Sequence, residues 1–143
     1  MASLNPYLNF NGNCKEAMTH YHHIIGGDFQ LQTFGDAPMD SPPELKDQVM
    51  HASIVSDKIT IMASDAQPGQ PATFGSAIWL NINCDSGDQQ NHLWNGLSDG
   101  GTVVMELQDT FWGARFGMFI DKFGIGWMLN FESAGQNSEG YMH

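Results

Sequence analysis

The sequence predicts an α+β fold made of two tandem βαβββ modules. Three observations support this prediction: alternating apolar residues typical of strands, apolar stripes with helical spacing that end at glycine pairs, and a repeat of this order after a linker. A chain of 143 residues can bury roughly two-thirds of its unfolded surface in one domain. We expect module one at residues 1–64, a linker at 65–73, module two at 74–132 and a polar tail at 133–143.

The first module reads as a strand, a helix and three further strands. Residues 6–11 alternate between apolar and polar side chains, as in a half-buried strand. Residues 14–25 place apolar side chains at i, i+3, i+4 and i+7, and the glycine pair that follows ends this helix. Residues 28–34 alternate again, and residues 49–55 and 59–64 form two strands across a turn.

Residues 35–48 contain three prolines and are interpreted as a long loop without regular structure. The loop has the length of a lid over a binding site, and equally of a disordered connection. Residues 65–73, DAQPGQPAT, have the composition of a linker.

The second module repeats this order. Residues 80–84, LNINC, resemble residues 8–11, LNFN, and a second helical segment ends at the glycine pair 100–101. The separations are 80 − 8 = 72 and 100 − 26 = 74 residues. Residues 107–111 repeat the strand after the first helix, and residues 110–131 form an aromatic hairpin that must be covered by other elements.

The charge balance excludes some classes of partner. Five basic residues against sixteen acidic ones give a formal charge of −11, whereas nucleic acids and anionic membranes are bound chiefly through Lys and Arg. No apolar run of about 18 residues predicts a membrane span, and the N-terminal residues do not resemble a secretory signal. Two cysteines are too few for a disulfide framework. We therefore expect a cytoplasmic protein that binds neither nucleic acid nor membrane.

Three segments resemble a known family. They are PYLNFNGNCKEAMTHY from Pro6, IMASDA from Ile61 and QDTFWGARFGMFIDKFGIGWM from Gln108. Together they are similar to PhnB-type proteins of the glyoxalase/bleomycin resistance/dioxygenase (vicinal oxygen chelate) superfamily, often labelled 3-demethylubiquinone-9 3-methyltransferase-like. The resemblance extends over residues 5–131, and Lys122 replaces the proline that this branch often has.

The resemblance implies two βαβββ modules that form a curved mixed sheet around a pocket, in a homodimer that sometimes exchanges modules. Metal-using members place His, Gln or Glu ligands on the first and last strands of each module. The corresponding positions here contain no His, Glu or Asp, which implies a pocket without that metal chemistry. These positions are Asn5 or Tyr7, Met62 or Ser64, Ala77, and Met128 or Asn130.

Large aromatics with a few amides and hydroxyls are typical of a small-molecule pocket, and describe an ordinary core or a dimer interface about as well. The ligand pocket that we expect consists of Tyr7, Asn9, Met62, Ser64, Trp79, Asn81, Phe111, Trp112, Phe116, Met118 and Met128.

Other residues with chemical potential have simpler interpretations. His20, His22 and His23 lie on the outer face of the first helix and are expected to be exposed surface histidines. Cys14 and Cys84 lie near helix starts, where a helix dipole lowers a thiol pKa, but no base accompanies them and packing is the simpler role.

Asp65, Asp109 and Asp121 flank turns and are expected to cap them. No carboxylate pair is predicted for acid–base catalysis, and His51 has no predicted partner. The glycine pairs end helices rather than begin them, so the common fold for S-adenosylmethionine is not predicted.

The favoured hypothesis is a metal-free binding protein for a small hydrophobic or aromatic molecule, with no cofactor and no assigned catalytic residue. The alternative is a metal-dependent lyase, isomerase or dioxygenase, or a methyltransferase-like enzyme, of the same superfamily. A third hypothesis is a dimer or partner module that binds no ligand.

Overall fold

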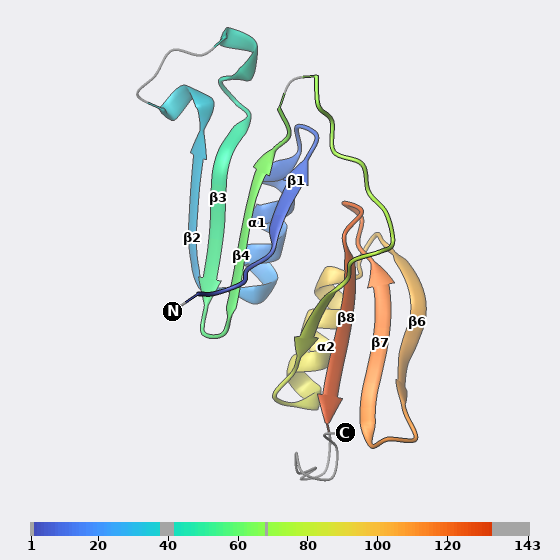
Figure 1. Ribbon diagram of the computed structural model, residues 1–143. Helices are drawn as coiled ribbons and strands as arrows, with labels where there is room; N and C mark the ends of the chain where they lie inside the picture. Colours follow the sequence, from blue (N-terminus) through green and yellow to red (C-terminus); the bar gives the residue numbers. More distant parts are fainter. Residues whose placement is uncertain (1, 38–41, 68, 133–143) are drawn as a thin grey trace. The chain divides into compact units, whose positions relative to one another are not determined.

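The computed structural model describes residues 2–37, 42–67 and 69–132, and it divides into two compact units, Met1–Thr73 and Phe74–His143. We call them module one and module two. Each contains one four-stranded mixed sheet with a helix against one face (Figure 1). In both modules the elements follow the order β, α, β, β, β. The predicted α+β fold with two βαβββ modules is therefore confirmed.

The sheet of module one has the strand order β1-β4-β3-β2, in which β1 runs parallel to β4 and the other neighbours are antiparallel. The prediction of this module's strands and helix agrees with the structure to within one or two residues. Its elements are β1 (Tyr7–Phe10), α1 (Cys14–Ile25), β2 (Asp28–Thr33), η1 (Phe34–Asp36), η2 (Pro43–Leu45), β3 (Val49–Ser56) and β4 (Ile59–Asp65).

The core of module one lies between α1 and the sheet. The apolar stripe of α1 becomes its buried face, and the alternate residues of each strand point toward it. The helix ends at Gly26, which has φ 82° and donates its N–H to the His22 carbonyl at 2.8 Å. The buried residues include Phe10, Cys14, Ala17, Met18, Tyr21, Ile24, Ala52, Ile54, Ile61 and Ala63.

Asp65 differs from its prediction as a turn cap. It is the last residue of β4, is buried, and accepts three backbone N–H groups from distant parts of module one. Oδ1 accepts from Gly12 and Cys14 at 2.9 Å each, and Oδ2 accepts from Val49 at 2.8 Å. Because Asn13 makes no side-chain cap bond, this carboxylate takes the place of a local cap at the start of α1.

Residues 35–48 are more ordered than predicted. They contain two short 3₁₀ turns, η1 and η2, and backbone bonds join the ends of the loop. The Phe34 N–H donates to the Gln48 carbonyl at 3.0 Å, and the Gly35 N–H donates to the Lys46 carbonyl at 2.9 Å. Prolines exclude a long helix or strand here but permit such turns. Residues 38–41, within the predicted lid, lie outside the described residues.

The sheet of module two has the strand order β5-β8-β7-β6, with β5 parallel to β8. β6 begins five residues before the predicted strand 107–111, because two register shifts hide its alternation in the sequence. The elements are β5 (Leu80–Asn83), α2 (Gly87–Leu97), β6 (Thr102–Asp109), β7 (Ala114–Ile120) and β8 (Gly126–Glu132).

Two buried polar side chains stabilise module two. Gln90 of α2 is fully buried and donates from Nε2 to the carbonyls of Arg115 at 2.8 Å and Leu129 at 3.2 Å. Asp121 caps the β7–β8 turn, as predicted, and its Oδ2 also accepts the indole N–H of Trp127 at 2.7 Å. The aromatic hairpin is thus covered by α2 on one face.

Candidate functional site

Each sheet has a helix on one face, and we call the opposite face its open face. Strand alternation and the register assign residues to each face. On module one, Tyr7 lies opposite Met62, and Met62 lies opposite Ser53. Asn9 lies opposite Ser64 in the next row. Four predicted pocket residues, Tyr7, Asn9, Met62 and Ser64, therefore share the open face of module one.

The open face of module one is polar. The Tyr7 hydroxyl lies 3.5 Å from Nδ1 of His51, a long and therefore weak hydrogen bond, and the two rings are 5.9 Å apart. Ser64 donates its hydroxyl to Oδ1 of Asn9 at 3.2 Å. His51 was predicted to have no partner, although strand alternation through Val49–Ser56 could have placed it on this face.

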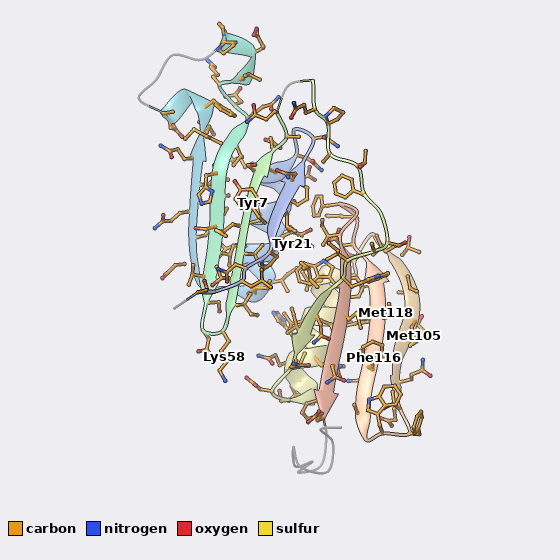
Figure 2. The ribbon with its side chains drawn as sticks, viewed as in Figure 1. Tyr7, Tyr21, Lys58, Met105, Phe116 and Met118 are labelled. Carbon is orange, nitrogen blue, oxygen red and sulfur yellow. The ribbon has the colours of Figure 1, made fainter. Side chains whose placement is uncertain are left out.

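The open face of module two is richer in apolar and thioether side chains. Met105, Met118 and Met128 lie directly opposite one another on β6, β7 and β8, and Asn81 of β5 continues the row. Figure 2 labels Met105 and Met118 on neighbouring strands of this face. Met118 and Met128 are half-buried, whereas Met105 and Asn81 are exposed.

The next row on this face adds an aromatic ring and three amides. Gln108, Phe116, Asn130 and Asn83 are successive cross-strand neighbours. Figure 2 shows Phe116 on the same strand as Met118. Oδ1 of Asn83 accepts hydrogen bonds from Asn81 at 3.1 Å and Asn130 at 3.3 Å. The amides thus form a hydrogen-bonded group beside the apolar part of the face.

Trp79 rests on a glycine at one end of this open face. A Cβ added at Gly126 would lie 2.7 Å from the Trp79 ring, so only glycine permits this contact. The indole N–H donates to the Ser76 carbonyl at 2.9 Å, which fixes the ring orientation. On the helix side of the same sheet, Gly117 has an equivalent relation to Trp94.

Phe111 and Trp112 lie in the β6–β7 turn rather than on the strands. Their rings are 5.0 Å apart at 87°, an edge-to-face pair. Phe111 is 97% exposed and Trp112 is 42% exposed. The structure therefore separates these two predicted pocket residues from the rows that contain Phe116, Met118 and Met128.

The register corrects one of the predicted metal-ligand positions. Matching the open-face positions of the two first strands in order equates Tyr7 with Asn81, an offset of 81 − 7 = 74 residues rather than 72. The third ligand position thus falls at Asn81, whereas Ala77 precedes β5. Tyr7, Met62, Asn81 and Met128 supply a phenol, two thioethers and an amide, which do not fit a divalent metal ion.

The described part of the chain, residues 2–37, 42–67 and 69–132, also contains no group of three or more His, Cys, Asp or Glu that could hold a metal ion. In α1, the ring of His22 stacks on Phe29 with centroids 4.9 Å apart and contacts the Gly27 carbonyl at 3.0 Å. His20 and His22 are half-buried and only His23 is exposed, so the prediction of exposure is correct for His23 alone.

Both cysteines are free and buried. Burial, with a smaller effect of the Asp65 charge, raises the pKa of Cys14 to about 12. Burial, with a smaller effect of the Asp85 charge, raises the pKa of Cys84 to about 11. The thiols are therefore protonated at neutral pH and are poor nucleophiles, which agrees with a packing role.

Residues 2–130 match the protein family described as 3-demethylubiquinone-9 3-methyltransferase. The chain belongs to this family. YjdN of Escherichia coli (strain K12) is 30% identical over 138 residues, which cover 89% of this chain and 93% of YjdN. The crystal structure of PA1353 from Pseudomonas aeruginosa is 42% identical, with a TM-score of 0.85 over 94% of this chain and 100% of that one.

More distant structures share the fold alone. One is a PhnB protein from Bacillus cereus, described as a putative 3-demethylubiquinone-9 3-methyltransferase, with 22% identity and a TM-score of 0.74 over 91% of this chain and 99% of that one. Another is a glyoxalase/bleomycin resistance protein/dioxygenase family enzyme from Burkholderia phytofirmans, with 15% identity and a TM-score of 0.57 over 89% and 97%. The resemblance to PhnB-type proteins of this superfamily is thus confirmed.

None of the helices in the described ranges is long and apolar enough to cross a membrane.

Proposed function

We propose that the protein binds a small hydrophobic or aromatic molecule and does not use divalent-metal catalysis. The open face of module two is the main support. Its thioether row, Met105–Met118–Met128, lies beside Phe116 and is bordered by amides. Apolar surface with a few oriented polar groups is the usual composition of a ligand site.

The side chains on this face suit a flat apolar ligand. Methionine is flexible and polarizable and makes favourable contacts with aromatic rings. Phe116 and Trp79 offer ring surfaces, and the amide of Asn81 can donate to or accept from a polar group of the ligand. The open face of module one could add hydrogen bonds from Tyr7 and Ser64 in the cup that the resemblance implies.

The enzymatic alternative has less support. The family description names a methyltransferase, but a nucleophile or general base requires a group with a suitable pKa in a defined geometry. The cysteine thiols have raised pKa values, and the ligand positions lack donors for a hard metal ion. We therefore propose binding, and we do not extend the methyltransferase activity to this chain.

We also propose a homodimer in the cytoplasm, on the basis of the superfamily resemblance and the sequence analysis. Two free, buried cysteines suit a reducing compartment. Native mass spectrometry at micromolar concentration would give twice the 15.8 kDa chain mass. A purely monomeric spectrum would contradict the dimer.

The binding proposal can be tested with an uncharged aromatic panel, such as 2-naphthylmethanol and related alcohols. We expect a thermal shift and a Kd measurable by calorimetry, and we expect Phe116→Ala to weaken binding by about tenfold through lost ring contact. Phe131→Ala is the matched control, because Phe131 lies on the helix side of the adjacent strand. Equal weakening by both variants, or no shift with any compound, would contradict the proposal.

Metal analysis of untagged protein provides an independent test. We expect substoichiometric Zn, Ni, Mn and Fe. One bound divalent ion per chain would instead favour the metal-dependent enzyme.

A further inference from the structure

All five basic side chains of the protein lie away from the open faces. Two are in or near helices on the covered side, and three are in loops or turns. Lys15 is exposed on α1, Arg115 donates to Gln90 and Asn91 of α2, Lys46 follows η2, Lys58 lies in the β3–β4 turn, and Lys122 lies in the β7–β8 turn.

The contacts of Arg115 hold its charge on the helix side of module two. Its Nη1 lies 3.3 Å from Oε1 of Gln90 and 2.9 Å from Oδ1 of Asn91. Lys122 is placed over the ring of Phe123, 5.3 Å from the centroid. Neither cation can neutralise an anion on the open face without giving up these contacts and, for Arg115, crossing to the other side of the sheet.

The open face of module two does carry an acidic group. Glu132 lies opposite Ala114, and alternation along β8 places it on the same face as Met128 and Asn130. The protein as a whole has a formal charge of −11, which attracts cations toward its surface and repels anions. The local charge and the net charge therefore have the same sign.

We propose that the ligand of this face is a planar aromatic cation, an inference that rests on the proposed function and adds the charge of the ligand to it. An anion placed here would lose hydration without gaining a cationic partner. A cation gains the negative face of the Phe116 ring, amide oxygens and the Glu132 carboxylate. The same aromatic surface thus selects among ligands of equal shape by their charge.

Three probes of matched shape test this inference: 2-naphthylmethylammonium, 2-naphthylmethanol and 2-naphthoate, each titrated by calorimetry into the full chain. We expect the ammonium to bind on the order of tenfold more tightly than the alcohol, because cation–π and ion-pair contributions add to the shared ring contact. We expect the naphthoate to bind most weakly. Higher salt should reduce the difference between ammonium and alcohol.

Glu132→Gln localises the effect. We expect it to weaken binding of the ammonium severalfold and to leave binding of the alcohol unchanged. Asp88→Asn is the matched control, since it removes the same charge from an exposed position in the first turn of α2 and should change neither probe. An equal loss with both variants would mean that net charge alone acts, and would overturn the assignment to this face.

The outcomes separate the two proposals. Naphthoate binding as tightly as the ammonium would overturn the charge inference and leave the proposed function standing. Binding of none of the three probes would overturn both. Loss of the alcohol in Phe116→Ala, together with the expected order of the three probes, would support both.

Discussion

The two modules share an order of elements, yet each depends on a different kind of buried carboxylate. Asp65 of module one accepts N–H groups from Gly12, Cys14 and Val49, which are 53, 51 and 16 residues away. Asp121 of module two accepts from donors no more than 6 residues away. The same fold can therefore be stabilised by one long-range polar centre or by a local turn.

The helix starts explain this difference. In module two, Ser86 caps α2 by accepting the Gln89 N–H at 3.0 Å, and Gln90 bonds the helix to the sheet. In module one Asn13 makes no side-chain cap bond, so the exposed N–H groups at the start of α1 need another acceptor. A local cap makes a distant carboxylate unnecessary.

Asp65→Ala should have the largest effect on stability. It removes the acceptor of three N–H groups, two of them in buried bonds, and each unsatisfied buried donor costs about 1–3 kcal/mol. We expect the free energy of unfolding to fall by about 3–5 kcal/mol in urea titrations. Amide hydrogen exchange should accelerate at Cys14 and Val49.

Asp88→Ala is the control for this experiment, because it removes an exposed carboxylate from the first turn of α2. Its cost should stay below about 1 kcal/mol. A loss of similar size in both variants would mean that Asp65 acts through its charge and not through its hydrogen bonds.

The role of Asp65 also marks the limit of what the sequence predicts. Apolar spacing placed α1 at Cys14–Ile25 and separated the open-face residues Tyr7 and Met62 from the core, because burial enforces periodicity over many residues. A single carboxylate that connects segments 51 residues apart leaves no periodic signal. From the sequence, Asp65 could be recognised only as a residue beside a turn.

Module two was predicted less well for a related reason. Register shifts around Met105 interrupt the alternation of β6, so the sequence indicated only its last part. The echo of LNFN in LNINC suggested an offset of 72 residues, whereas strand register gives 74 and moves the third ligand position from Ala77 to Asn81. Short matches do not fix a register; hydrogen-bonded neighbours do.

The two tryptophan–glycine contacts of module two provide the second prediction. A Cβ at Gly117 would lie 2.7 Å from the Trp94 ring, which packs edge-on against Phe119. We expect Gly117→Ala to destabilise the protein by about 1–3 kcal/mol through overpacking. Gly126→Ala should cost less than about 1 kcal/mol, because the half-buried Trp79 ring can move outward.

The readouts distinguish the two faces of the sheet. Gly117→Ala should lower the urea midpoint, whereas Gly126→Ala should mainly change Trp fluorescence and weaken the naphthyl probes. Equal midpoints for the two variants would show that the helix side of the sheet is no more tightly packed than the open face.

The smallest predicted effect compares the two cysteines. With a pKa of about 12 for Cys14 and about 11 for Cys84, the thiolate fractions at pH 8 differ by about tenfold, or about 1.4 kcal/mol. Both lie well below the fraction of an exposed thiol. In timed alkylation of the folded protein, followed by mass spectrometry of each cysteine peptide, Cys84 should react first.

These raised pKa values also set the direction of an alkaline effect on stability. The folded state keeps both thiol protons to higher pH than the unfolded state, whose thiols titrate near 9.0. The stabilisation is therefore complete below about pH 9 and is lost as pH rises toward 11–12. Cys14→Ala should flatten this decline more than Cys84→Ala, because Cys14 has the larger shift; an unchanged decline in both variants would mean that other groups cause it.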